Sequence, residues 1–381
     1  MTIKKGFSLG NSKFVPVSKP AISPEDKAAV VAALEAGWVS GEGPIVSEFE
    51  NSLTRTFKKK FAISCNSGTA AIDLTIAALG LGPSDRVICP SFTIGSCCFE
   101  LARRGVRIDF IDSEMETFNP TEEAYLDAIR DDTTAILIPH IYGFCVDVPK
   151  IKQRLNGRKI SIIEDCAESQ FMYYPSGGLV GSVADIVTFS FYANKTVVAG
   201  EGGAVLCDDA VISQRLSQYR NLCFDADRRF VHTDLGWNYR LSSLNAALAN
   251  SQLKRGALNH KKKVGIGVKY YMGLRDVVDI YLPPPVIGQR VNGYWIVPIV
   301  LKNSNREERD RFANYLKNKG IGNRPFFAPL HLQKVFGSNV EKNSLVNCEL
   351  LGDTGLYVPS FIGISDDEID FVINTVRLYF V

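Results

Sequence analysis

Between residue 61 and about residue 208, short apolar runs alternate with helical patterns, and this alternation limits the fold more than any other feature. The runs are rich in Val, Ile and Phe and are often apolar on both faces, as in strands buried under helices. This order predicts an α/β domain with a largely parallel sheet. The expected strands are 61–65, 86–89, 107–111, 135–139, 160–164, 185–191 and 203–207, with helices at 70–79 and 122–130.

Around residues 252–265 the sequence becomes basic and helix-prone, which predicts a domain boundary. We expect a large domain over residues 1–255, including an N-terminal arm, and a smaller α+β domain over residues 256–381. The smaller domain should contain strands at 294–301 and 321–327 and a helix at 306–319. Its last helix should begin at Ser365, because Ser365 and Glu368 have the spacing of a capping box.

Composition excludes several classes of function. There are 43 basic and 41 acidic residues, so a net charge of +2 gives no case for nucleic acid or an anionic membrane. The lysine runs at 58–60 and 261–263 are interpreted as solvated faces. The nine cysteines lack metal-type spacing, and several lie in or beside apolar runs, so reduced thiols and a cytoplasmic location are expected. We find neither a signal-peptide pattern nor a membrane-length apolar stretch, and the scattered histidines predict no metal site.

The run Asn66-Ser67-Gly68-Thr69-Ala70-Ala71 follows an expected strand and opens an expected helix. Free backbone N–H groups and the helix dipole at such a turn favour an anion, and small residues let a phosphate approach closely. Taken alone, this run is better explained as an ordinary strand-to-helix turn. Ser190, which ends a later strand, could add a hydroxyl donor to the same phosphate.

Lys195 and Asp165 each lie at or after the end of an expected strand. A lysine can hold an aldehyde cofactor as a Schiff base, and an acid can pair with a pyridinium nitrogen. Taken alone, Lys195 would be a solvated loop residue and Asp165 a helix N-cap, with Glu164 and Glu168 as neighbouring alternatives. Their occurrence with a phosphate turn, in this order, predicts a pyridoxal phosphate enzyme. Phe92, after another strand, could stack on the cofactor or simply pack in the core.

Several segments together resemble the DegT/DnrJ/EryC1/StrS family of sugar aminotransferases, from about residue 15 to the C-terminus. This resemblance implies a fold-type I pyridoxal phosphate enzyme, built like aspartate aminotransferase. The segments are Trp38-Val39-Ser40-Gly41, the run at 66–71, Pro90-Ser91-Phe92-Thr93, Glu164-Asp165-Cys166-Ala167-Glu168, residues 189–196, Gly200-Glu201-Gly202-Gly203, Trp237-Asn238-Tyr239-Arg240-Leu241, residues 324–331 and residues 355–360.

The resemblance also implies roles for single residues. Lys195 should carry the cofactor and move the proton, and Asp165 should pair with the ring nitrogen. Asn238 should reach the phosphate of a neighbouring subunit, which implies a homodimer with shared active sites. The implied cofactor-binding residues are Ser67, Gly68, Thr69, Phe92, Asp165, Glu168, Ser190, Lys195 and Asn238, and the implied substrate-binding residues are Trp38, Glu168, Arg324 and His331.

Within the family, Asn194-Lys195-Thr196, Glu168 and residues 324–327 are most similar to the GDP-perosamine synthase branch. That similarity implies amination of a GDP-linked 4-keto-6-deoxy sugar at C4, with L-glutamate as donor, for surface polysaccharide such as O-antigen. Cys166, residues 144–147 and Asn323 depart from the usual pattern near places that contact substrate. A UDP- or dTDP-linked keto sugar, a 3-keto sugar and an 8-oxo nonulosonate-like acid therefore stay open. A dehydratase and a non-enzymatic sensor also stay open, although Lys195 and Asp165 weigh against both.

Overall fold

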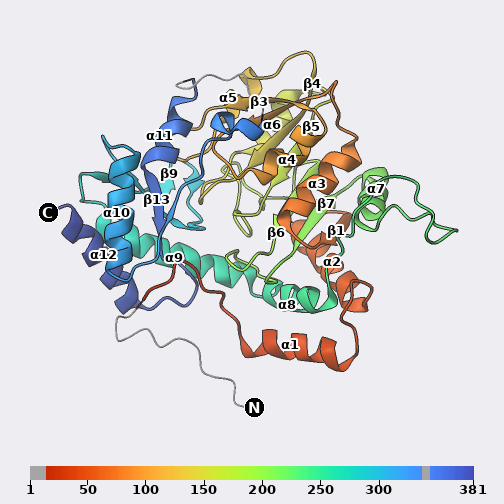
Figure 1. The fold of residues 1–381 in the computed structure, drawn as a ribbon, viewed down its shortest axis with the longest axis horizontal. Coiled ribbons are helices and arrows are strands. Elements are labelled where there is room, and N and C mark those ends of the chain that lie inside the picture. Colours follow the sequence, from red (N-terminus) through yellow and green to blue (C-terminus); the bar gives the residue numbers. More distant parts are fainter. Residues whose placement is uncertain (1–13, 337–343) are drawn as a thin grey trace.

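A seven-stranded mixed sheet forms the centre of the computed structural model, which describes residues 14–336 and 344–381 (Figure 1). Its strands are β1 (Phe61–Cys65), β2 (Arg86–Pro90), β3 (Arg107–Ile111), β4 (Thr133–Pro139), β5 (Ser161–Asp165), β6 (Ile186–Ser190) and β7 (Gly203–Cys207). The order is β1-β7-β6-β5-β4-β2-β3, and β7 alone is antiparallel to both of its neighbours. The expected α/β fold with a largely parallel sheet is confirmed.

Both faces of this sheet are buried, which explains why its strands are apolar at consecutive positions. In β4, Ala135 and Leu137 pack on one face, while Ile136 and Ile138 pack on the other. The first face is covered by α3 (Gly68–Leu79), α4 (Ser96–Arg103) and α7 (Ala210–Arg220). The second is covered by α2 (Pro44–Phe57), α5 (Glu122–Asp127), α6 (Val148–Leu155) and α8 (Ser243–Leu253).

A second core is built by elements at the left of Figure 1 together with the end of the long helix α9 (Gly256–Leu274). A four-stranded antiparallel sheet of order β12-β13-β11-β8 supports it. Val15 bridges to Ile321 and is completely buried in this core, so the start of the described chain packs here. The elements are β8 (Ile280–Tyr281), β11 (Val297–Leu301), β12 (Arg324–Pro325), β13 (Gly355–Val358), α10 (Arg306–Asn318), α11 (Val346–Thr354) and α12 (Asp366–Tyr379).

The predicted boundary near residue 255 falls between α8 and α9, and the division into two domains stays a prediction. The remaining elements are helix α1 (Pro24–Glu35), the small hairpin of β9 (Val286–Ile287) and β10 (Arg290–Val291), and the two short 3₁₀ helices Leu330–Leu332 and Lys334–Phe336.

Local signals explain where several elements begin and end. Ser365 and Glu368 form the predicted capping box of α12. The strand expected at 294–301 begins only at Val297, because Tyr294 has a left-handed backbone with φ of 46°. The strand expected at 321–327 is limited to Arg324–Pro325, and Pro325 has no N–H to extend the pairing.

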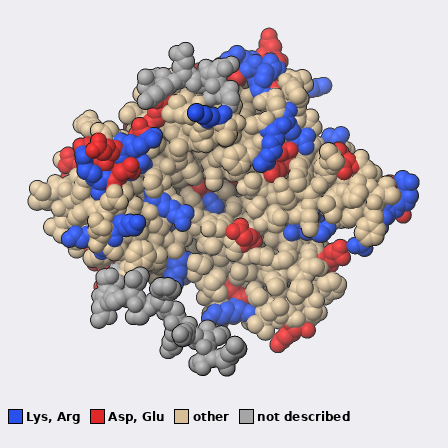
Figure 2. Space-filling model, viewed as in Figure 1, with Lys and Arg blue, Asp and Glu red and all other residues tan. Residues whose placement is uncertain are grey.

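All nine cysteines are free and buried. In the described part of the chain, no helix combines the length and the apolar character needed to cross a membrane. On the face shown in Figure 2, basic and acidic side chains are interspersed. The solvated-face interpretation of the lysine runs is wrong for two residues: Lys59 and Lys263 are buried, and Lys59 pairs with Asp208 at 2.9 Å.

Candidate active site

A cavity of about 310 Å³ lies where β4, β5 and β6 end and α3 begins. It is the natural place for a ligand, because loops at the carboxyl ends of parallel strands form a crevice there. Eight of the predicted site residues line it: Ser67, Gly68, Thr69, Asp165, Glu168, Ser190, Lys195 and Arg324.

One end of the cavity is the first turn of α3, which is capped by Ser67. Its Oγ accepts a hydrogen bond from the N–H of Ala70 at 3.1 Å. Gly68 approaches Ser190 so closely that a Cβ on it would lie 2.7 Å from the Cβ of Ser190. Gly203 is equally restricted, since its Cβ would lie 2.2 Å from the carbonyl oxygen of Ser67. This end is therefore a close-fitting cradle at a helix N-terminus, suited to a phosphate.

Asp165 ends β5 and is buried, and its carboxylate faces the cavity. Its Oδ1 accepts from the Ala167 N–H at 3.1 Å and from Thr188 Oγ1 at 3.2 Å. Burial raises the pKa of Asp165, although these hydrogen bonds and Lys195 partly oppose the shift. The residues after Asp165 form turns in the described chain, so Asp165 does not cap an α-helix. A buried carboxylate of this kind suits a cationic ring nitrogen.

Lys195 meets Glu168 and Trp295 inside the cavity. Its Nζ lies 3.5 Å from Glu168 Oε1 and 4.0 Å from the centroid of the Trp295 ring. Glu168 Oε2 also accepts the N–H of Tyr142 at 3.1 Å. Burial nevertheless raises the pKa of Glu168 to about 7, and the attraction of Lys195 offsets this only in part. An amine and a carboxyl that exchanges protons near neutral pH therefore lie side by side.

The loop that carries Lys195 is fixed from both sides by one amide side chain. Gln170 Nε2 donates to the carbonyl of Ser190 at 2.8 Å, and its Oε1 accepts the N–H of Val197 at 2.8 Å. Trp295 Nε1 donates to the carbonyl of Asn194 at 3.2 Å. These contacts restrict the movement of the Lys195 amine. Neither Gln170 nor Trp295 was predicted from the sequence.

Comparison with known proteins agrees with this geometry. The model of the DegT/DnrJ/EryC1/StrS aminotransferase family matches residues 20–377. The chain belongs to this family. Curated relatives include the GDP-perosamine synthase of Escherichia coli O157:H7, 29% identical over 97% of this chain and 99% of that protein. The GDP-perosamine synthase of Vibrio cholerae is also 29% identical, over 96% of this chain and 99% of the relative.

Solved structures share the fold. The aminotransferase TlmJ from Streptoalloteichus hindustanus has a TM-score of 0.84 and 25% identity, covering 96% of this chain and 98% of that one. The Helicobacter pylori aminotransferase PseC has a TM-score of 0.88 and 21% identity, covering 97% of this chain and 99% of that one. The protein is a sugar aminotransferase of this family, and its cofactor is pyridoxal 5′-phosphate.

The residues of the cavity fit this cofactor. The α3 cradle at Gly68 and Ser190 suits the phosphate, Asp165 suits the ring nitrogen, and Lys195 offers the amine that an aldehyde requires. Ile94 also lines the cavity, whereas Phe92 does not. Phe92 is fully buried and packs its ring against Tyr142 and Phe326, with centroids 5.7 and 5.8 Å apart. In the structure, therefore, Phe92 packs in the core, which was the alternative to stacking, and Ile94 lies on the cavity wall.

Three other predicted residues lie outside this cavity. Trp38 is 44% exposed and borders a groove between α1, α2 and α8. His331 is buried, with Nδ1 2.6 Å from Ser91 Oγ and Nε2 3.2 Å from Glu349 Oε1. Asn238 is exposed beyond α7, as a residue that serves another subunit would be. The substrate roles of Trp38 and His331 stay predictions without support from cavity geometry.

His140, Glu164 and Cys166 form a buried group whose ligand atoms lie within 4.8 Å of one another. His140 Nε2 bonds to Glu164 at 2.8 Å, its Nδ1 accepts the N–H of Val146, and Tyr174 donates to both Glu164 oxygens. Because Nδ1 of His140 accepts and its Nε2 donates to a carboxylate, neither ring nitrogen has a free lone pair for a metal. The group is therefore explained as a hydrogen-bonded support beneath the cavity.

Proposed function

We propose that this enzyme transfers an amino group from L-glutamate to C4 of a GDP-linked 4-keto-6-deoxy sugar. The observation that carries the choice of sugar is that relatives aligned over nearly all of both chains are named GDP-perosamine synthase. Arg324, at the edge of the cavity, is assigned to the diphosphate, because a guanidinium matches phosphate oxygens. Glu168 is assigned to the sugar as well as to proton exchange.

Pyridoxal phosphate, when bound, supplies an aldehyde that accepts the amino group and a ring that stabilises negative charge at the reacting carbon. We assign Lys195 to hold the cofactor and to move a proton at its Nζ. Glu168, 3.5 Å away, can receive or return that proton, because its raised pKa lies near neutrality. Asp165, buried and fixed by Thr188, would supply a negative charge to the ring nitrogen of the bound cofactor.

The remaining cofactor contacts are assigned by position. Gly68, Thr69 and Ser190 face the cradle at the start of α3, where backbone N–H groups and hydroxyls can bind the phosphate. Ser67 shapes the cradle by capping the helix. Gln170 keeps Lys195 in place by bonding both sides of its loop.

We also propose a homodimer in which Asn238 completes the partner's phosphate site. Asn238 is exposed and follows two large exposed apolar side chains, Phe230 at 75% and Leu235 at 87% exposure. Apolar exposure of this kind is typical of an interface. Mixing inactive Lys195→Ala chains with inactive Asn238→Ala chains should restore activity in hybrid dimers. A monomer that keeps full activity at high dilution would contradict this arrangement.

The proposed setting is cytoplasmic synthesis of a sugar for surface polysaccharide, and nine buried free thiols support a reducing compartment. The substrate test is a panel of GDP-, UDP- and dTDP-linked 4-keto-6-deoxy sugars with glutamate, followed by mass spectrometry of the sugar. We expect an aminated product from the GDP sugar. Turnover restricted to a UDP or dTDP sugar would refute the choice of nucleotide and leave the aminotransferase activity in place.

A further inference from the structure

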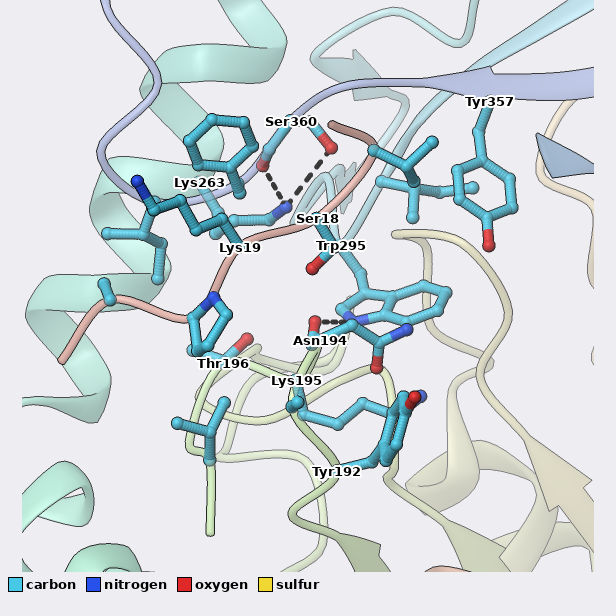
Figure 3. A pocket seen from close by; sticks show the side chains of 18 of the residues that line it. Ser18, Lys19, Tyr192, Asn194, Lys195, Thr196, Lys263, Trp295, Tyr357 and Ser360 are labelled. Carbon is cyan, nitrogen blue, oxygen red and sulfur yellow. Dashed lines mark hydrogen bonds between the residues drawn. The ribbon is translucent and has the colours of Figure 1, made fainter. Parts of the chain in front are cut away.

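A second cavity, of about 170 Å³, adjoins the candidate active site (Figure 3). The two cavities share the lining residues Tyr192, Asn194, Lys195, Trp295, Arg324 and Tyr357. Its walls include residues 17–21, residues 192–198, helix α9 and residues 360–362, which are distant in sequence. In Figure 3, Lys263 enters from α9 on one side and Lys195 from its loop on the other. The proposed function assigns roles to Lys195 and Arg324 in this lining but gives none to Lys263.

The charged side chains that line the cavity have one sign. Lys19, Lys195, Lys263 and Arg324 line it, and none of the described lining residues is acidic. A cleft lined by charges of a single sign concentrates ions of the opposite sign. The cavity is therefore suited to an anion.

Lys263 is the innermost of these cations and is only 7% exposed. Its Nζ donates to the carbonyl oxygen of Ser360 and, at 3.3 Å, to the Ser360 hydroxyl. No carboxylate of the described residues forms an ion pair with it, although a buried ammonium without a counter-charge is costly. Burial accordingly lowers the pKa of Lys263 to about 7. A bound anion would supply the missing counter-charge.

Asn194 adds a second signal of a different kind. Its side-chain oxygen is buried, yet it has no hydrogen-bond partner among the described residues. Such an acceptor, close to a group of cations, matches a ligand that carries both an ammonium and a carboxylate. The cavity is also smaller than the roughly 300 Å³ or more that larger ligands occupy, which favours an amino acid over a nucleotide sugar.

We propose that this cavity binds a carboxylate of the amino donor, with Lys263 as the cation that pairs with it. The inference rests on the proposed transamination, because that reaction requires the donor's amino group to lie beside Lys195. The carboxylate bound by Lys263 is a separate contact from this reacting amine. Lys263 is thus a residue for donor specificity, and the nucleotide sugar is held elsewhere, toward the larger cavity.

The test uses the holoenzyme and glutarate, a dicarboxylate that has no amino group to transfer. Isothermal titration calorimetry should detect glutarate binding to the wild type and to Lys262→Met, a matched change of the exposed neighbour on α9. Lys263→Met should bind glutarate about tenfold more weakly or worse, since one charge-assisted bond is lost. Lys263→Gln keeps a hydrogen-bond donor without the charge, so it should be equally impaired.

Proton uptake gives a readout that a merely structural lysine would not change. At about pH 8, the wild-type enzyme should take up a proton when it binds glutarate, because Lys263 becomes charged. Calorimetry in buffers of different ionisation heat measures this uptake. Lys263→Met should show no uptake. This variant keeps the other ionisable groups that face the cavity, which are Lys19, Lys195, Arg324, Tyr192 and Tyr357.

Wild-type affinity for glutarate in both Lys263 variants would overturn the proposal. So would a defect of these variants confined to the reaction with keto sugar, which would assign the cavity to the diphosphate. A wild-type enzyme that aminates its sugar while failing to bind glutarate would refute this donor site alone. If no sugar in the panel were aminated, the proposed function itself would fail.

Discussion

Glu168→Gln tests the electrostatics of the candidate site most directly. Glu168 is 9% exposed, and burial raises its pKa from 4.5 to about 7, so the folded protein binds its proton more tightly than the unfolded chain does. The stability that this proton contributes is fully present below about pH 4.5 and is lost as the pH rises through about 7. This rise in pKa corresponds to about 3 kcal/mol in the free energy of unfolding.

Gln mimics the protonated side chain at every pH, so E168Q should escape that loss. Urea unfolding of the cofactor-free protein should give similar stability for wild type and E168Q near pH 5. Near pH 8 the variant should be more stable by up to about 3 kcal/mol. The matched control is Glu201→Gln, because Glu201 lines the same cavity but is exposed. A difference between wild type and E168Q that does not change with pH would refute the reasoning.

Four further predictions concern the same cavity. Borohydride reduction followed by peptide mapping should label Lys195, and Lys195→Ala should fold without this label; a label on another lysine would contradict the assignment. Asp165→Asn should retain the cofactor but slow turnover by about a hundredfold, whereas near-normal turnover would leave Asp165 only a structural role. Gly68→Ala should lose cofactor on dialysis, judged by visible absorption, because its Cβ would lie 2.7 Å from a neighbouring carbon; full retention would argue against the cradle. Phe92→Ala should lower stability by about 3 kcal/mol in urea unfolding with little effect on cofactor affinity, and Ile94→Ala should show the reverse; weakened binding in the Phe92 variant alone would restore its predicted stacking role.

The fold was predictable because its signals are local. Strands buried on both faces must be apolar at consecutive positions, as 135–139 are, and such runs are visible without any tertiary contact. The cradle was predictable for the same reason, since a small-residue turn between β1 and α3 needs only its own neighbours. Lys195 and Asp165 were predictable as site residues from their order along the chain. Each lies at or after the end of a strand, and parallel strands bring their carboxyl ends to one edge of the sheet.

Which residue after β2 forms the cavity wall depends on contacts that the local sequence does not contain. Phe92 and Ile94 both follow β2, and nothing near them indicates which one faces the cofactor. Phe92 turns inward because Tyr142 and Phe326 meet it there, and these come from different elements far along the chain. The partners of Lys195 present the same difficulty, since Trp295 comes from a segment far along the chain, just before β11.

Lys263 is a different case, because a signal was present in the sequence. The buried positions of α9 include Asn259, Lys263, Gly267, Tyr270 and Leu274, which are three or four residues apart and so share one face of the helix. A basic run interrupts that face at a single position, whereas Lys261 and Lys262 point to solvent. A lysine on the buried stripe of a helix is expensive unless something pairs with it. The helical period therefore identifies Lys263 as a candidate binding residue, whereas the composition of the lysine run at 261–263 indicates only a charged surface.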